Sequence, residues 1–310
     1  AWHARRPDLG SGPSSMEAAT SVDLVSVERV TPLPAGALDR YAGKAFAISL
    51  AGFGAGLLAT GDPDRAVVAL HAGLPRAARF GREAFASRLG AVLAGRGVVV
   101  FDPWALRLLD RIDCLVVEAA LLCEPDKSDQ PTPSGLALLA AARRAGLQTI
   151  VVTRGEPAWA ALAADQLASD TDAAATVRHA QKEGRVVCAV AEGTSPALAV
   201  ADCAIGLCLP ATPTPWHAHV LAGEALDDAE LVIEACAAAV RASRQSVVLA
   251  MAGGVIGAVL GFGGRLTGGP DRAMAAVHGA SLLAVLNGRR LVRRLGSRLA
   301  PATPAMRGEG

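Results

Sequence analysis

Residues 134–153 read SGLALLAAARRAGLQTIVVT and join a helical stretch directly to a β-strand. Residues 134–145 are dominated by Ala, Leu and Arg, which favour an α-helix. Gly146 ends that run, and residues 148–152 (QTIVV) carry the β-branched, apolar side chains of a buried strand. A helix followed two residues later by a buried strand is typical of the α/β class.

The same alternation continues on both sides of this stretch. Short apolar runs predict further strands at 113–117, 186–190 and 203–207, and Ala-rich runs predict helices at 158–168, 173–183 and 196–201. Strands that alternate with helices in this way pair in parallel, with the helices as crossovers. We therefore expect a doubly wound parallel sheet in the middle of the chain.

Apolar segments flank this α/β region. Residues 45–60 (AFAISLAGFGAGLLAT) and 246–264 (SVVLAMAGGVIGAVLGFGG) carry no charge, nor do residues 273–288, and 66–75 is a shorter apolar run. A membrane span needs roughly 17–25 residues, and small-residue faces suit packing between membrane helices. We expect two membrane hairpins, with four buried helices of a soluble protein as the alternative.

Arginines follow each apolar pair, at 76, 79, 82 and 88 and again at 289, 290, 293 and 294. Positive residues collect on the cytoplasmic side of a membrane. The pattern predicts a multi-pass protein of the cell membrane, with the central domain and both termini in the cytoplasm.

Composition limits the classes of function. The 310 residues are 52% apolar and 19% charged, with mean hydropathy +0.35 and net charge +1, so nothing indicates a nucleic-acid partner. The six cysteines form no CxxC pair, and we expect buried, reduced thiols. The sequence begins with Ala1 rather than Met, which agrees with a piece of a longer protein.

Several runs, in order between residues 43 and 295, resemble P-type cation-transporting ATPases, in particular heavy-metal and actinobacterial members. Residues 97–113 (GVVVFDPWALRLLDRID) are similar to the stretch that follows the fourth membrane helix of that family. Residues 134–153 resemble the helix and strand before its TGD motif. The other similar runs are 177–187 (VRHAQKEGRVV), 196–206 (PALAVADCAIG) and 274–290 (MAAVHGASLLAVLNGRR).

The resemblance implies the C-terminal half of such a protein, with a haloacid-dehalogenase-like (HAD-like) phosphorylation domain between transmembrane helical hairpins. The expected organisation is a lead-in at 1–42, a membrane hairpin at 43–81, the HAD-like domain at 82–245, a second hairpin at 246–295 and a tail at 296–310.

The catalytic motifs of the family are degenerate in this sequence. Family members attack ATP with an aspartate and hold Mg²⁺ with the carboxylates of a GDGxND loop. The resemblance places Glu118 at the attacking position and Glu192 in a shortened metal loop, while Thr153 keeps the residue type of the TGD motif. The motif lysine is replaced by Ala119, and the lysine before the 177–187 run by Ala173. We expect these catalytic positions to be inactive.

The nucleotide-binding domain is missing, because only residues 123–132 separate the attacking position from the next helix. We therefore expect no cofactor and no bound metal; Mg²⁺ and ATP would be used only if the protein is active after all. The Cys-Pro-Cys ion motif of heavy-metal pumps is reduced to Pro75. Together with His278 and Asn287 of the last apolar segment, Pro75 is a candidate for an ion pathway.

We expect a catalytically inactive membrane homologue that is structural or regulatory for a complete pump. Its partners would be membrane lipids and a complete P-type ATPase or the rest of a longer chain. One alternative is an active metal or cation transporter, or a HAD-type phosphohydrolase, that uses Glu118 and Glu192 as paired carboxylates. A product without any role is another alternative. His217 and His219 are a candidate pair of metal ligands.

Overall fold

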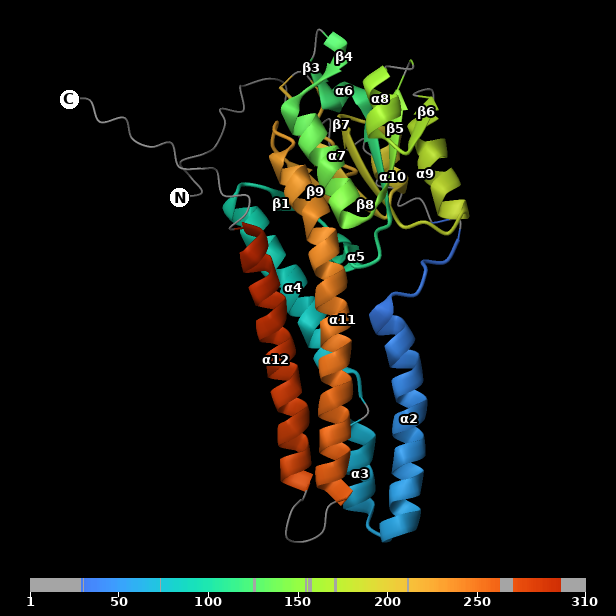
Figure 1. The fold of residues 1–310 in the computed structure, drawn as a ribbon, viewed down its shortest axis with the longest axis vertical. Helices are drawn as coiled ribbons and strands as arrows, with labels where there is room; N and C mark the ends of the chain where they lie inside the picture. Colours follow the sequence, from blue (N-terminus) through green and yellow to red (C-terminus); the bar gives the residue numbers. More distant parts are fainter. Residues whose placement is uncertain are drawn as a thin grey trace, which may run out of the picture.

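An α/β domain sits at one end of a bundle of long helices (Figure 1). This computed structural model describes residues 29, 31–72, 74–124, 127–153, 155, 158–169, 172–210, 212–262 and 270–296. Residues 1–28 and 297–310 lie outside this description, and with them most of the predicted lead-in and tail.

Five helices form the bundle: α2 (Ala37–Thr60), α3 (Pro63–Ala72), α4 (Arg76–Gly95), α11 (Asp227–Phe262) and α12 (Pro270–Gly296). The described parts of the predicted apolar segments fall on them, except that Leu74 and Pro75 lie between α3 and α4. Ala37–Thr60 and Asp227–Gly261 are long and apolar enough to cross a membrane. The helices extend beyond the predicted segments, since α2 starts before residue 43, α4 continues past residue 81 and α11 starts well before residue 246.

The α/β domain is built on a seven-stranded sheet in the order β1-β9-β8-β7-β2-β5-β6. Neighbouring strands from β9 to β6 are parallel, and β1 pairs antiparallel with β9 at the edge. The strands are β1 (Val99–Val100), β2 (Cys114–Glu118), β5 (Gln148–Thr153), β6 (Gln166–Ser169), β7 (Val187–Glu192), β8 (Cys203–Leu207) and β9 (Val220–Ala222).

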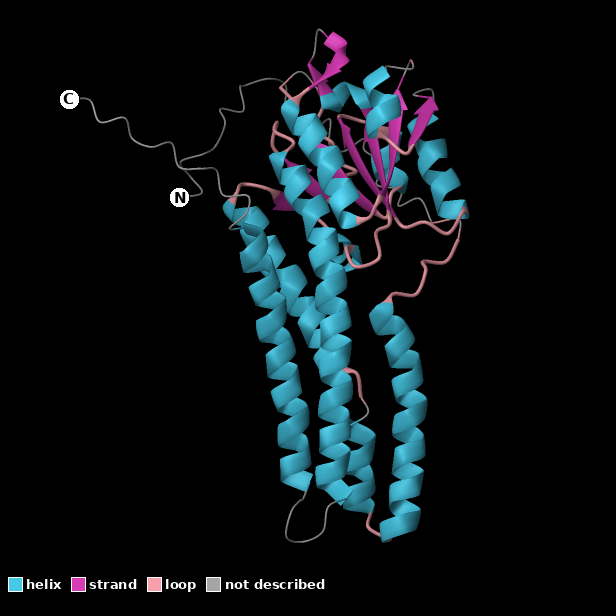
Figure 2. Ribbon diagram, in the orientation of Figure 1, coloured by secondary structure: helices cyan, strands magenta, loops and turns pink. Residues whose placement is uncertain are grey.

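Helices cover both faces of the sheet (Figure 2). They are α5 (Pro103–Leu108), α6 (Ala119–Leu122), α7 (Pro133–Ala145), α8 (Ala158–Ala163), α9 (Ala173–Lys182) and α10 (Pro196–Val200), and a small hairpin, β3 (Cys123–Glu124) with β4 (Lys127–Pro131), follows α6. The predicted fold class, a doubly wound parallel sheet joined to membrane helices, is confirmed.

Alternate residues of each strand enter two separate cores. Leu115 and Val117 of β2 pack with α7 and α11, whereas Val116 packs with α9 and α10 on the other face. The cysteines are free thiols and, except for half-buried Cys208, they are buried, as expected. Burial raises the pKa of Cys114 to about 12, so this thiol stays protonated at neutral pH.

Two parts of the predicted secondary structure are wrong. The expected helix 158–168 ends at Ala163, and Gln166–Ser169 forms strand β6 instead. Helix propensity favours this Ala-rich stretch, but parallel pairing with β5 satisfies its backbone groups, as in the bond from the Asp165 amide to the Thr149 carbonyl at 3.0 Å. Strands β1 and β9 were not predicted either, because two or three residues carry no periodic signal.

Helix α11 belongs to both halves of the molecule. Its first turns supply Leu231, Ile233 and Cys236 to the larger core of the α/β domain. Its later turns pack against α4 and α12 in the bundle. An uninterrupted helix through both halves fixes the orientation of the sheet relative to the bundle.

Candidate functional site

The predicted catalytic residues all lie at the carboxyl edge of the parallel sheet. Glu118 ends β2, Thr153 ends β5 and Glu192 ends β7. The chain leaves β2 toward β5 and β6 and later returns to β7 on the other side of β2. Such a point, where connections depart in opposite directions, opens the crevice in which doubly wound folds bind ligands.

The Glu118 carboxylate is engaged by a neighbouring loop. Ser195 donates its hydroxyl hydrogen to Glu118 Oε1, with 2.5 Å between the oxygens. Ser195 is the N-cap residue of α10 but makes no capping bond with its side chain. Ser195 was not singled out in the sequence, although a Ser before Pro at a helix start is a recognisable N-cap signal.

Glu192 lies at the same edge but on the opposite face of the sheet. Glu118 pairs with Val152 of the α9/α10 core, whereas Glu192 pairs with Leu207 of the α7/α11 core. Gly193 follows with φ +54°, a left-handed conformation that glycine adopts without strain, and the Ser195 amide closes the turn on the Glu192 carbonyl at 3.2 Å. Glu192 Oε2 is buried without a hydrogen-bond partner.

Apolar packing occupies the positions that follow Glu118. Helix α6 begins directly after it, and Ala119 and Leu121 pack against the larger core. Ala173, 6% exposed, is part of the smaller core at the start of α9. Thr153 Oγ1 accepts a local hydrogen bond from the Gly155 amide at 3.3 Å. No positive side chain therefore stands at either of the two positions where the resemblance calls for lysine.

Close backbone contacts join the end of α6 to the start of α7. The Leu122 carbonyl accepts a hydrogen bond from the Thr132 amide at 2.7 Å, across the base of the β3–β4 hairpin. A Cβ atom on Gly135 would lie 2.5 Å from the same carbonyl oxygen, so glycine is required for this approach. Both ends of the hairpin are thus tied to the start of α7.

Comparison with known proteins agrees with this arrangement. The "Probable cation-transporting ATPase I" of Mycobacterium tuberculosis (strain H37Rv) is 44% identical over 88 residues, and the protein of that name from Mycobacterium leprae is 42% identical over 87 residues. Two crystal structures of a zinc-transporting PIB-type ATPase, one of them in the E2.Pi state, share the fold. Their TM-scores are 0.59 and 0.57 over 86% and 84% of this chain, at 14% identity.

The chain is a relative of the P-type cation-transporting ATPases. The aligned part covers 28% of this chain but only 5% of the curated relatives, and the chain spans 66% and 64% of the two crystallised chains. No family model matches the sequence. The similarity to these proteins and the two apolar helices identify a membrane protein.

Pro75, the residue of the reduced ion motif, lies between helices α3 and α4. Pro75 is the N-cap residue of α4, and α3 ends at Ala72. Asn287 on α12 donates a hydrogen bond to Gln245 of α11 at 2.8 Å, whereas His278 is exposed. Within the described residues, no hydrogen bond joins Pro75, His278 and Asn287, and their role in an ion pathway stays a prediction.

The remaining candidate is the pair His217 and His219, of which His219 makes a hydrogen bond to the backbone. His219 Nδ1 accepts a hydrogen bond from the Ala204 amide at 2.9 Å, so that nitrogen faces the backbone. Over the described ranges, no group of three or more His, Cys, Asp or Glu side chains could hold a metal ion.

Proposed function

We propose that this chain is a catalytically silent, membrane-embedded relative of P-type ATPases that serves the assembly or regulation of a complete pump. The observation that carries the proposal is the state of the attacking position. Glu118 is hydrogen-bonded to Ser195 and is followed by a helix whose side chains pack into the core.

Phosphoryl transfer to a carboxylate needs positive charge around two anions. Catalysis of this reaction rests on positioning and on electrostatic stabilisation by Mg²⁺ and basic side chains. Here Ala119 and Ala173 stand at the expected lysine positions, and the Glu192 turn is short. Glutamate is also one methylene longer than aspartate, and a misplacement of about 1 Å can lower a rate about 10²-fold.

The nucleotide supply is a second obstacle. Between the attacking position and α7 lie only the short paired strands β3 and β4, whose ends are tied through Leu122 and Thr132. A segment of this size buries too little apolar surface to make a domain. We therefore propose that the chain uses neither ATP nor Mg²⁺.

The test is phosphoenzyme formation by the purified protein and by Glu118→Asp. The substitution restores the length of the nucleophile and nothing else, and catalytic components that act as a unit are strongly non-additive. We expect no acid-stable, hydroxylamine-sensitive label from radioactive ATP in either protein. Glu183→Asp, an exposed position in the same domain, is the matched control, and an active P-type ATPase labelled in parallel shows that the assay works. A labelled native protein would contradict the proposal.

The buried, unpartnered Glu192 Oε2 favours a second candidate function, a Mg²⁺-dependent phosphohydrolase or transporter that uses both carboxylates. A ligand at a hundredfold excess over its Kd stabilises a folded protein by about 2.7 kcal/mol. A melting shift with Mg²⁺-ATP, together with p-nitrophenyl phosphate hydrolysis that is lost in Glu118→Gln and Glu192→Gln, would establish this function. We expect neither.

A further inference from the structure

Helices α11 and α12 line an open cavity of about 560 Å³. Its size falls within the roughly 300–1,000 Å³ of small-molecule sites. The lining comes from α11 (Arg244, Gln245, Val248, Leu249) and α12 (Leu283, Leu286, Asn287, Arg290). None of the residues that explain the α/β site belongs to this cavity.

On both helices, the polar lining residues lie toward one end of the cavity and the apolar ones toward the other. On α11, Arg244 lies one turn before Val248, and on α12, Arg290 lies one turn after Leu286. Because α11 runs away from the α/β domain and α12 runs back toward it (Figure 1), both arginines lie at the end of the cavity nearest the domain. The hydrogen-bonded amides of Gln245 and Asn287 also lie toward that end, and the apolar side chains follow.

The charges in the cavity are unbalanced. Arg244 and Arg290 are exposed, and neither forms an ion pair with any residue that the structure describes. The lining residues include no acid. Two guanidinium groups held beside an apolar groove attract a ligand with an anionic head and an apolar tail.

The apolar part faces outward. Val248 is 63% exposed and Leu283 is 55% exposed, on the segments expected to lie in the membrane. Their surroundings are then acyl chains, and the arginine end of the cavity lies where the apolar segments stop. Basic pockets between membrane helices are known to bind the head groups of anionic lipids.

We infer that the α11/α12 cavity is a binding site for an anionic phospholipid. Arg244 and Arg290 hold the phosphate of the head group, the Gln245–Asn287 amides face the glycerol region, and an acyl chain lies along Val248, Leu283 and Leu286. The inference rests on the chain's being a membrane protein and is independent of whether the α/β domain catalyses any reaction.

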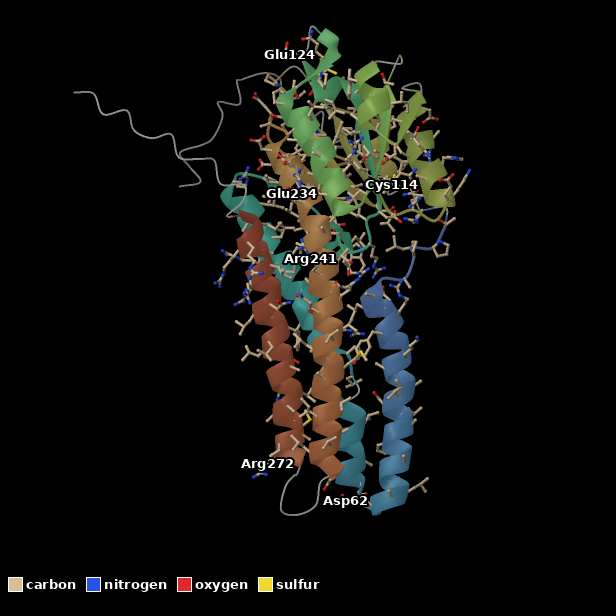
Figure 3. All side chains as sticks on the ribbon, in the orientation of Figure 1. Asp62, Cys114, Glu124, Glu234, Arg241 and Arg272 are labelled. Atoms are coloured by element: carbon tan, nitrogen blue, oxygen red, sulfur yellow. The ribbon has the colours of Figure 1, made fainter. Side chains whose placement is uncertain are left out.

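The experiment is native mass spectrometry of the 310-residue chain in detergent, titrated with palmitoyl-oleoyl phosphatidylglycerol or with the matching phosphatidylcholine. The test protein is Arg244→Gln/Arg290→Gln. The matched control is Arg241→Gln/Arg293→Gln, which removes two charges from the same helices outside the cavity; Arg241 is labelled in Figure 3. Each arginine near an anionic head group contributes about fivefold in affinity, so the test variant should bind phosphatidylglycerol about 30-fold more weakly.

We expect the native protein and the control to prefer phosphatidylglycerol, and the test variant to bind both lipids alike. Leu286→Trp, which fills the groove without changing charge, should also weaken lipid binding. It replaces the double arginine variant as the test protein if that variant does not fold. Equal losses in test and control variants would mean diffuse attraction and overturn the inference. Displacement by millimolar inorganic phosphate would instead assign the arginines to a free anion. Loss of a dimer in Leu286→Trp, with lipid binding unchanged, would assign the groove to a second copy of the chain.

Discussion

His219 shows how one residue can join separate segments of the α/β domain through its backbone and its side chain. Its amide donates to the Ala204 carbonyl at 2.9 Å, and its Nδ1 accepts from the Ala204 amide at 2.9 Å. Its own carbonyl accepts from the amides of Phe101 and Asp102. Since a backbone amide can only donate, the ring is neutral with its proton on Nε2. Burial lowers the pKa of His219 below the usual 6.5.

Stability should therefore depend on the protonation of His219. Because the pKa of His219 is lower in the folded state, the unfolded chain binds the proton first as the pH falls. The stability that the neutral ring contributes is therefore present above pH 6.5 and is lost as the pH falls below it. In His219→Asn, Oδ1 can accept from the Ala204 amide but does not titrate. When the pH is lowered from about 7.5 to about 5.5, we expect the melting temperature of the native protein to fall more than that of the variant.

The control for this measurement is His217→Asn, two residues earlier, which leaves the Ala204 hydrogen bond in place. Its melting temperature should follow the native pH dependence. If His219→Asn also runs parallel to the native protein at every pH, the neutral-ring assignment is wrong.

At the scale of elements, small residues let α4, α11 and α12 approach closely. A Cβ atom on Gly288 of α12 would lie 2.6 Å from the Gly81 carbonyl oxygen of α4, and one on Gly81 would lie 1.9 Å from Ser246 Oγ of α11. Helices in membranes associate through such contacts because lipid offers no hydrophobic driving force. Ser246 and Gly288, at the ends of two charge-free segments, thus form packing surfaces with Gly81 of α4.

Gly288→Ala should loosen this packing. The added methyl group meets backbone atoms that cannot move aside, and overpacking of this kind destabilises by about 1–3 kcal/mol, more than the roughly 1 kcal/mol that alanine contributes to a helix. We expect a lower melting temperature in detergent. Gly279→Ala on the same helix is the control, because a Cβ atom there meets nothing within 4 Å, and its melting temperature should be unchanged or higher. Equal effects would refute the close approach of α4 and α12.

At the scale of the whole molecule, a polar junction fastens the α/β domain to the bundle. Arg111 pairs with Asp39 of α2 at 2.6 Å, and Ser243 of α11 donates to Asp110 at 2.5 Å. The Asp110 side chain is 2% exposed, and burial raises its pKa although the bond to Ser243 and the nearby Arg82 and Arg111 oppose the shift. Together with the shared helix α11, this junction makes the two halves one body.

The proposed orientation can be tested at the two ends of that body. Asp62 and Arg272 lie at the end of the bundle remote from the α/β domain, whereas Cys114 and Glu124 lie within the domain (Figure 3). Native Cys188 and Cys203 are unsuitable probes because both are fully buried. In a Cys208→Ser background, exposed positions Asp64 and Lys182 can each be replaced by cysteine.

We expect an impermeant maleimide to label Asp64→Cys in intact cells and Lys182→Cys only after lysis. We expect this pattern because the positive-inside rule predicts the arginine-rich end, and with it the α/β domain, on the cytoplasmic side. The protein should also remain in the membrane fraction after carbonate extraction. The reverse labelling pattern would overturn the orientation, and recovery in the soluble fraction would overturn the hairpins.

The sequence by itself determined the features that depend on local periodicity. Alternating strands and helices, charge-free segments and the edge shared by Glu118, Thr153 and Glu192 all follow from short-range patterns, because parallel strands align their carboxyl ends. The family resemblance has the same basis, since colinear runs are read along the chain.

Only the tertiary structure decided what distant residues do to one another. Ser195 meets Glu118 across 77 positions, and Asn287 meets Gln245 across 42. The register of β7 puts Glu192 on the face opposite Glu118, and pairing with β5 turns Gln166–Ser169 into a strand against its helix propensity. Register and pairing are set by the packing of whole elements, which no local pattern encodes, and for that reason the α11/α12 cavity too became visible only in three dimensions.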